Sequence, residues 1–143
     1  MIKSFFTTIL IAVSLVGIPL GGVALALTPS PKGAQEYFIE PADGAEIEGP
    51  VKIIFGLSGM GVAPAGTDKP NTGHHHLLID TKLEDFTSSI PKDDKHRHFG
   101  GGQTETVIKL APGKHTLQLI LGDKDHIPFS PPVKSKIITI FVK

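Results

Sequence analysis

Short runs of β-branched and apolar residues, each closed by Gly, Pro or Asp, constrain the fold of this chain more than any other feature. Runs of this length predict strands, and the residues between them predict turns and loops. No segment carries the sustained apolar stripe of a capped helix. We therefore expect an all-β fold, an immunoglobulin-like antiparallel β-sandwich of about six to eight strands. Six strands are predicted outright, at residues 36–40, 51–57, 75–80, 104–110, 114–121 and 136–142.

Two segments between these strands are too long to be simple turns, Gly59–Gly73 and Thr81–Gly102. The second has room for one helical turn near residues 83–86. Long loops in compact domains are commonly functional. Both loops border the strand His75–Asp80, so this strand is where we expect function.

The first 26 residues have the three parts of a secretory signal peptide. Lys3 supplies the positive charge, Phe5–Leu20 is almost wholly apolar, and Ala24–Ala26 has the small-x-small pattern of a cleavage site. We expect cleavage after Ala26. The alternative is an uncleaved membrane anchor, which Pro19 and the glycines after it disfavour because they fall where a span would have to continue.

Cleavage predicts a periplasmic or secreted protein with no stable membrane insertion. Residues 27–35 are rich in Pro, Ser and Gly and predict a flexible tether, and residues 36–143 predict a single domain. Once Lys3 is removed, the charged residues nearly balance, which excludes the broad basic surface that nucleic acids require. The chain contains no Cys, so disulfides, a lipid anchor and thiolate metal sites are all excluded.

All seven histidines lie in the second half of the chain, and three of them are consecutive. Side chains alternate along a strand, so His74 and His76 point to one face of the sheet. His75 then shares the opposite face with Leu77 and Ile79. Two residues on one face lie about 6–7 Å apart, within reach of one ion.

His96 and His98 repeat this spacing if their segment is extended. Two such pairs supply four nitrogen donors, a set that suits Cu(II), Zn(II) or Ni(II). The loop at 123–126 offers a further nitrogen or carboxylate, and Met60 offers a thioether for Cu(I). The predicted metal ligands are His74, His76, His96, His98 and His126, with copper or zinc as the ion.

The competing interpretation is that histidines serve as hydrogen-bonding fasteners of the fold. His75 is a candidate because its face carries apolar residues. His115 is a stronger one, since it follows Pro112 and Gly113 at the start of a core strand, where sandwich folds place corner-fastening side chains. The residues leave both interpretations open for the two predicted ligand pairs.

Several motifs together resemble a known family of small exported bacterial proteins. They are Gly73–Asp80 (GHHHLLID), the pattern HxHFGxGQTE at 96–105, PGxHTLxL at 112–119 and GDxxHxP at 122–128. The shared domain of that family has no assigned function, and members are sometimes labelled rod-shape-determining. The resemblance covers nearly the whole mature chain and implies a periplasmic sandwich domain. The rod-shape label does not suit a chain with one apolar segment.

Three functions are therefore weighed. The first is a periplasmic metal-binding protein, a copper or zinc carrier or buffer whose further partner is another periplasmic protein. The alternative is a non-metal module that binds a protein or glycan and uses its histidines structurally. The third, a metalloenzyme, would need an open coordination position and a base such as Glu105 or Asp80. Since nothing in the sequence marks either carboxylate as special, we expect a protein that is not an enzyme.

Overall fold

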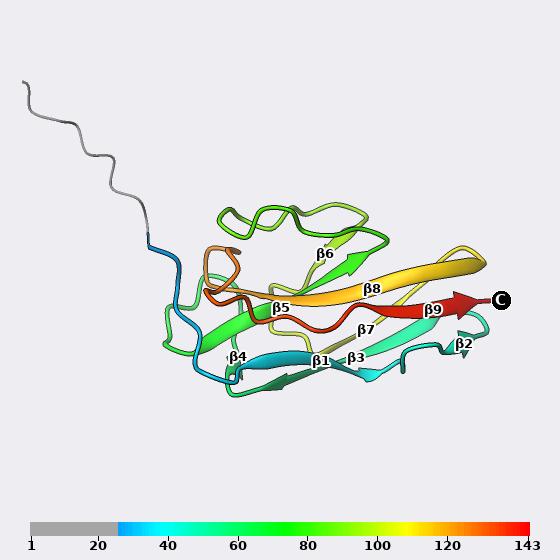
Figure 1. Ribbon diagram of the computed structural model, residues 1–143, viewed down its shortest axis with the longest axis horizontal. Coiled ribbons are helices and arrows are strands. Elements are labelled where there is room, and N and C mark those ends of the chain that lie inside the picture. Colours follow the sequence, from blue (N-terminus) through cyan, green and yellow to red (C-terminus); the bar gives the residue numbers. More distant parts are fainter. Residues whose placement is uncertain (1–25) are drawn as a thin grey trace, which may run out of the picture.

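A computed structural model describes residues 26–143, so the predicted signal peptide lies outside the described residues apart from Ala26. The described chain forms two facing sheets (Figure 1). The first sheet has the order β1-β3-β7 and contains β1 (Gln35–Glu40), β3 (Val51–Ser58) and β7 (Glu105–Ile108). The second has the order β2-β9-β8-β5-β4, with β6 also paired to β5. Its strands are β2 (Glu46–Ile47), β4 (Gly61–Val62), β5 (Thr72–Ile79), β6 (His96–His98), β8 (Gly113–Gly122) and β9 (Ile138–Val142).

This architecture confirms the predicted all-β sandwich, with differences at the sheet edges. Two pairings are parallel, β2 with β9 and β4 with β5, so the sandwich is not purely antiparallel. Both involve two-residue strands that form where a connecting segment runs along the edge of the second sheet. The predicted loops 59–73 and 81–102 contain β4 and β6, which are too short for a sequence pattern to reveal.

The main core lies between the two sheets. It contains Val51, Ile53 and Phe55 of β3 on one side, and the apolar residues of β5, β8 and β9 on the other. The alternation in β8 places Leu117 and Leu119 in this core. Each of these side chains is almost fully removed from water, which is the main stabilisation such a fold has without disulfides.

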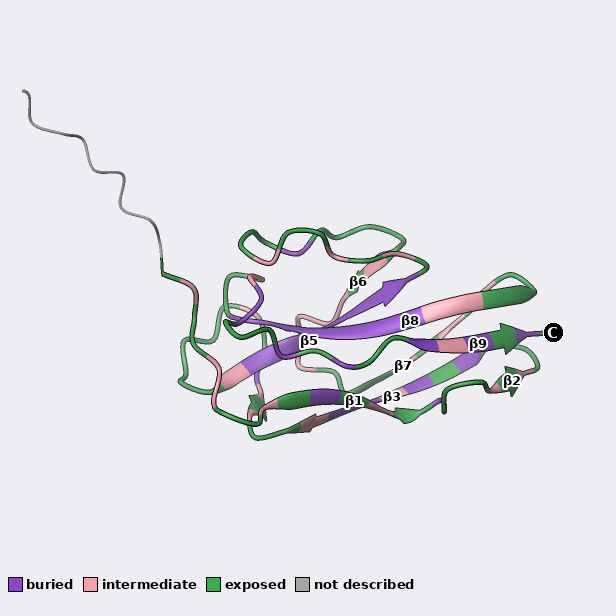
Figure 2. Cartoon of the chain, viewed as in Figure 1, coloured by how far each residue is buried: buried purple, intermediate pink, exposed green. Residues whose placement is uncertain are grey.

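The outer face of the second sheet is also covered, by the segment that follows β5. Ile90 packs against Leu78 of β5 and Ile120 of β8, with Leu83 and Phe86 beside them. Residues 83–86 are not helical, because their apolar side chains are drawn onto the sheet. Strand β5 is therefore buried on both faces, as Figure 2 shows by its colour.

The segment predicted to be a flexible tether contacts the domain near its beginning. Pro29 forms a bridge with Ser130, the Thr28 hydroxyl donates to Asp123 at 2.6 Å, and the Ser30 hydroxyl donates to the carbonyl of Pro131 at 2.8 Å. Residues 28–30 therefore lie beside the loop that follows β8. Within residues 26–143, no helix is long and apolar enough to cross a membrane.

Candidate metal centre

Strand register brings four histidines to the outer face of the second sheet. His74 and His76 share this face of β5, and antiparallel pairing sets His98 of β6 directly opposite His76. Directly opposed residues in such a pair point to the same face. His126 reaches the same place from the loop after β8. We call His74, His76, His98 and His126 the histidine tetrad.

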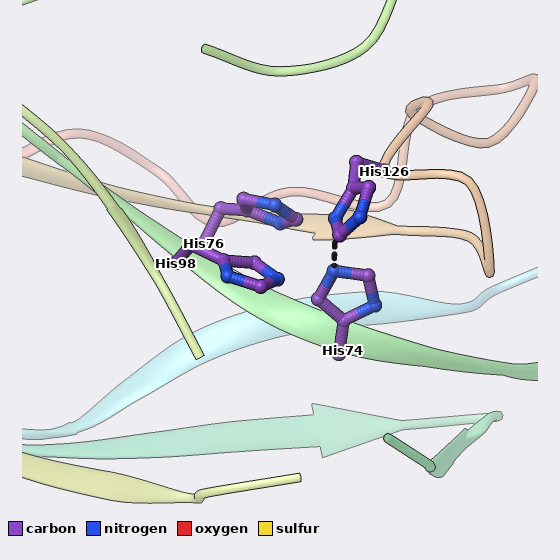
Figure 3. Close-up of side chains that lie close together, drawn as sticks. All are labelled: His74, His76, His98 and His126. Carbon is purple, nitrogen blue, oxygen red and sulfur yellow. Dashed lines mark hydrogen bonds between the residues drawn. The ribbon is translucent and has the colours of Figure 1, made fainter. Parts of the chain in front are cut away.

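The four rings of the tetrad converge on one point (Figure 3). Every pair of rings has centroids between 4.7 and 6.0 Å apart. Nε2 of His74 lies 3.0 Å from Nδ1 of His126, and one nitrogen from each ring lies within 4.8 Å of those of all the others. His74 and His76 are almost completely buried, whereas His98 and His126 are half-buried.

His96, the fifth predicted ligand, is not in this cluster. It pairs with Leu78, two residues along the strands from the pair of His76 with His98, and therefore lies further from the centre of the tetrad. Its Nδ1 lies 2.9 Å from the carboxylate of Asp93, which also accepts the His96 backbone N–H at 2.9 Å. Met60, the predicted thioether donor, packs instead beside the apolar cluster that contains Phe129.

Gly100 and Gly122 have no side chains, and this provides the room that the rings of His98 and His76 occupy. A Cβ atom at Gly100 would lie within 2.6 Å of Nε2 of His98, and one at Gly122 would lie 2.6 Å from Cε1 of His76. Such separations are far shorter than ordinary contacts of about 3.5–4.0 Å. Any residue with a side chain at either position would displace a tetrad ring. The glycine-rich stretch after His98 thus has a steric role at Gly100.

A tight turn after β8 holds His126 in place, with Asp123 at its centre. The Asp123 carboxylate accepts the backbone N–H groups of Asp125 at 2.9 Å and Ile127 at 3.0 Å. His126 itself has φ of +67°, a left-handed conformation that is uncommon outside glycine and asparagine. Backbone strain of this kind concentrates at functional sites and persists where the surroundings enforce it. The sequence suggested Asp123 only as a spare ligand, but its carboxylate organises the turn.

Three tetrad histidines are held in the neutral form. Burial, followed by the proximity of the other rings, lowers the pKa of His74 to about 4 and that of His76 to about 3. Burial, followed by the proximity of His126 and Lys92, also lowers the pKa of His98. At neutral pH these rings therefore present lone pairs, which is the form of imidazole that binds metals.

The unpaired nitrogens of the tetrad test whether a metal would fit. Nδ1 of His74, Nδ1 of His76 and Nε2 of His98 are buried without a hydrogen-bond partner in the described structure. Tetrahedral zinc bound by imidazoles at about 2.0–2.1 Å has ligand nitrogens about 3.3 Å apart. The tetrad nitrogens lie up to 4.8 Å apart, and ring movements of about 1 Å would bring them to this spacing around an ion. The donor set and its spacing fit a metal of the zinc or copper type.

A pocket of about 210 Å³ opens beside the tetrad. It is bounded by the rings of three tetrad members and by residues of the segment that covers the sheet. Its lining consists of His76, Ser89, Ile90, Lys92, His98 and His126. His74 does not line it, so an ion among the rings would be reached from the side away from His74. A larger open groove of about 710 Å³ between β6 and β7 touches only His98 of the tetrad.

His75 points to the opposite face, as the alternation predicts, and joins the two sheets. Its Nδ1 lies 2.5 Å from Oε1 of Glu36 on β1, and both side chains are completely buried. Burial raises the pKa of Glu36 well above its usual value and lowers that of His75 to about 4. The pair is therefore neutral, and the carboxyl O–H of Glu36 donates a hydrogen bond to Nδ1 of His75. No sequence pattern indicates this role of Glu36.

His115 fastens the hairpin that begins β8. Its Nδ1 lies 2.7 Å from the carboxylate of Asp80, and its Nε2 lies 2.8 Å from the carbonyl oxygen of Ala111. Two acceptors require both ring nitrogens to donate, which only the protonated ring can do. Burial alone would lower the pKa of His115, but these two hydrogen bonds outweigh it and raise the pKa. This arrangement agrees with the structural role predicted for His115.

Comparison with known proteins places the chain in a family. Residues 53–143, which include the whole tetrad, match the profile of the family described as Domain of unknown function (DUF4399). No curated protein gives a significant match. Among solved structures, the chain is similar to the X-ray structure of the endo-beta-1,4-mannanase from Thermotoga petrophila, with 19% identity and a TM-score of 0.46. That similarity covers 77% of this chain and 20% of the mannanase chain, a likeness too low to bear on activity. The family match spans more than half of the chain and agrees with the resemblance seen in the motifs, so the chain belongs to the DUF4399 family.

Proposed function

We propose that the protein is an exported metal-binding protein, a carrier or buffer of copper or zinc whose ligands are the histidine tetrad. The observation that carries this proposal is the convergence of four imidazoles whose ligand nitrogens lie within 4.8 Å of one another. Three of the four rings also bury a nitrogen that has no other partner in the described structure. An ion would satisfy the lone pairs that face the centre.

The ligand chemistry supports copper or zinc over harder ions. All four donors are imidazole nitrogens, which suit zinc, copper and nickel, whereas calcium and magnesium require oxygen ligands. The pKa values of His74 and His76 are low, so these two ligands are already neutral at neutral pH and release no proton when a metal binds. Affinity should therefore hold to lower pH than for exposed histidines.

The surroundings of the tetrad support binding rather than catalysis. None of the described residues that line the tetrad pocket is a carboxylate that could act as a base. Of the two carboxylates suggested by the sequence, Asp80 is bound to His115 and Glu105 lies exposed on β7. Four protein ligands are typical of zinc sites that store or stabilise rather than react.

Export is part of the proposal and rests on the N-terminal sequence. Lys3, the apolar stretch and the small residues before Leu27 together have the form of a cleavable signal. A periplasmic carrier would exchange its ion with another periplasmic protein. The half-buried ligands His98 and His126, which line the pocket, are where exchange would begin.

The test is a calorimetric titration of chelator-treated protein that carries no histidine tag. The sample consists of residues 27–143, which contain all the strands of the described structure. Cu(II), Cu(I) and Zn(II) are titrated separately into the wild type, the double variant His74→Ala/His98→Ala and the control His96→Ala. We expect micromolar or tighter binding of one ion that the double variant loses and the control keeps. Equal binding by all three proteins would contradict the tetrad as the site. No binding at all would favour the alternative of structural histidines in a protein- or glycan-binding module.

A further inference from the structure

The pocket beside the tetrad has a positive charge at its entrance and no negative charge in its lining. Lys92 and Ser89 come from the segment that covers the sheet, and the tetrad rings form the floor. Lys92 is close enough to act electrostatically on His98, whose pKa is lowered by burial, by His126 and by this lysine. The pocket is therefore suited to an anion.

A bound divalent ion would make this imbalance larger. Imidazoles are neutral ligands, so the tetrad would leave the full charge of the ion uncompensated in a partly buried site. The one carboxylate that acts electrostatically on His74 is Asp123, and its oxygens already accept three hydrogen bonds, from Thr28, Asp125 and Ile127. A charge of this kind requires a nearby counter-charge or an anionic ligand.

The volume of the pocket limits the size of such an anion. At about 30 Å³ for each water-sized group, 210 Å³ holds about seven of them. This suits a small inorganic anion or a short monocarboxylate. The hydroxyl of Ser89 and the ammonium group of Lys92 are the donors available to it.

We propose that the metal-loaded tetrad binds a small coordinating anion in this pocket, with the anion between the ion and Lys92. The inference rests on the proposed metal-binding function and adds a fifth, exogenous ligand to it. The anion enters from the side away from His74, where three tetrad rings line the pocket. Its chemical class is a carboxylate or an inorganic anion with one coordinating atom.

The experiment titrates the Cu(II)-loaded protein with azide and follows the visible charge-transfer band and the electron paramagnetic resonance spectrum. Acetate and bicarbonate are then added as competitors, to separate a carboxylate from an inorganic anion. Copper content and its dependence on His74 are measured first on the same samples. We expect a saturable band that the competing anion removes.

Variants of the entrance test the role of the charge. Lys92→Gln should weaken azide binding about fivefold, which is the upper range for an exposed charge, without weakening copper binding. Lys92→Arg should restore binding, and Lys95→Gln, an equal change of charge outside the pocket lining, should have no effect. The loss should shrink in high salt.

Two outcomes would overturn the inference, and they are distinguishable. Protein that takes up copper through His74 but shows no azide band lacks the anion site, while the metal-binding function stands. The same conclusion follows if Lys92→Gln and Lys95→Gln weaken azide equally. Protein that takes up neither copper nor zinc overturns both proposals together.

Discussion

Replacing Gly122 by alanine tests the position of His76 without substituting any of the proposed ligands. The added Cβ would lie 2.6 Å from Cε1 and 3.0 Å from Nδ1 of His76, and 3.4 Å from Cα of His126. Ordinary carbon contacts are about 3.5–4.0 Å, so the ring has to move by about 1 Å. His76 is only 1% exposed, so its ring cannot make this movement by turning into solvent.

The expected effects differ for stability and for metal binding. Overfilling a packed site costs about 1–3 kcal/mol, and replacing glycine in a strand returns about 0.5–1 kcal/mol. We therefore expect the Gly122→Ala protein to lose up to about 2.5 kcal/mol of metal-free stability. Displacing a ligand by about 1 Å should lower metal affinity about 10–100-fold, comparable to the loss of a group that orients a ligand.

Affinity is measured by competition with a chromophoric chelator, and stability by thermal melting of the metal-free protein. Gly61→Ala in β4, the edge strand beside β5, is the matched control. Its Cβ would lie 3.5 Å from Cγ2 of Thr72, an ordinary contact, so both readouts should stay near wild type. A Gly122→Ala protein that binds metal as tightly as the wild type would refute the placement of His76 as a ligand.

Three other substitutions have outcomes of known sign. In His126→Gly, relief of the left-handed conformation (about 1 kcal/mol) should offset the lost contact with His74, so thermal melting should show little change without metal and a largely lost metal-induced rise. Glu36→Gln keeps the hydrogen bond and removes a group whose folded-state pKa is raised above 4.5. Relative to this variant, urea unfolding should show the wild type losing up to about 1.4 kcal/mol per pH unit as pH rises above 4.5, whereas a constant difference would mean an ionised carboxylate. The pKa of His115 is raised above 6.5, so the stability advantage of the wild type over His115→Gln should be complete below pH 6.5 and decline as pH rises through the folded-state pKa; an advantage that grows with pH would contradict the double hydrogen bond.

The parts of the site that follow from local geometry could be predicted from the sequence. Side chains alternate in any strand, so the grouping of His74 with His76, and of His75 with the core, requires no knowledge of the partner strands. The strands themselves were recognisable because β-branched runs and turn residues are local signals.

The parts that depend on register could not be predicted. His96 and His98 are equivalent in the sequence, and both pair with β5. His98 falls opposite His76, whereas His96 falls opposite Leu78, about 6–7 Å further from the centre. Register is fixed by the packing of the whole sheet, which a strand of three residues does not encode by itself. The roles of Gly122 and Glu36 are hidden for the same reason, since each acts on a residue more than thirty positions away.

The histidines outside the tetrad show what a structural histidine looks like in this protein. His75, His96 and His115 each have a carboxylate partner, at 2.5, 2.9 and 2.7 Å respectively. In the described structure no tetrad ring has such a partner, and the one hydrogen bond among the four joins two of them. A buried polar atom without a partner costs about 1–3 kcal/mol. Three tetrad nitrogens are in this state in the described structure, as are Nε2 of His75 and Oε2 of Glu36.

The unpartnered nitrogens of the tetrad do not suit a purely fastening role, because no carboxylate lines the pocket beside them. Protonation offers no remedy, since the neighbouring rings and burial already hold the pKa values of His74 and His76 far below neutral. A metal cation held by the four rings would take one lone pair from each of them and link β5, β6 and the loop after β8. Metal binding should therefore raise the stability of these three segments most, which hydrogen exchange of their backbone amides would detect.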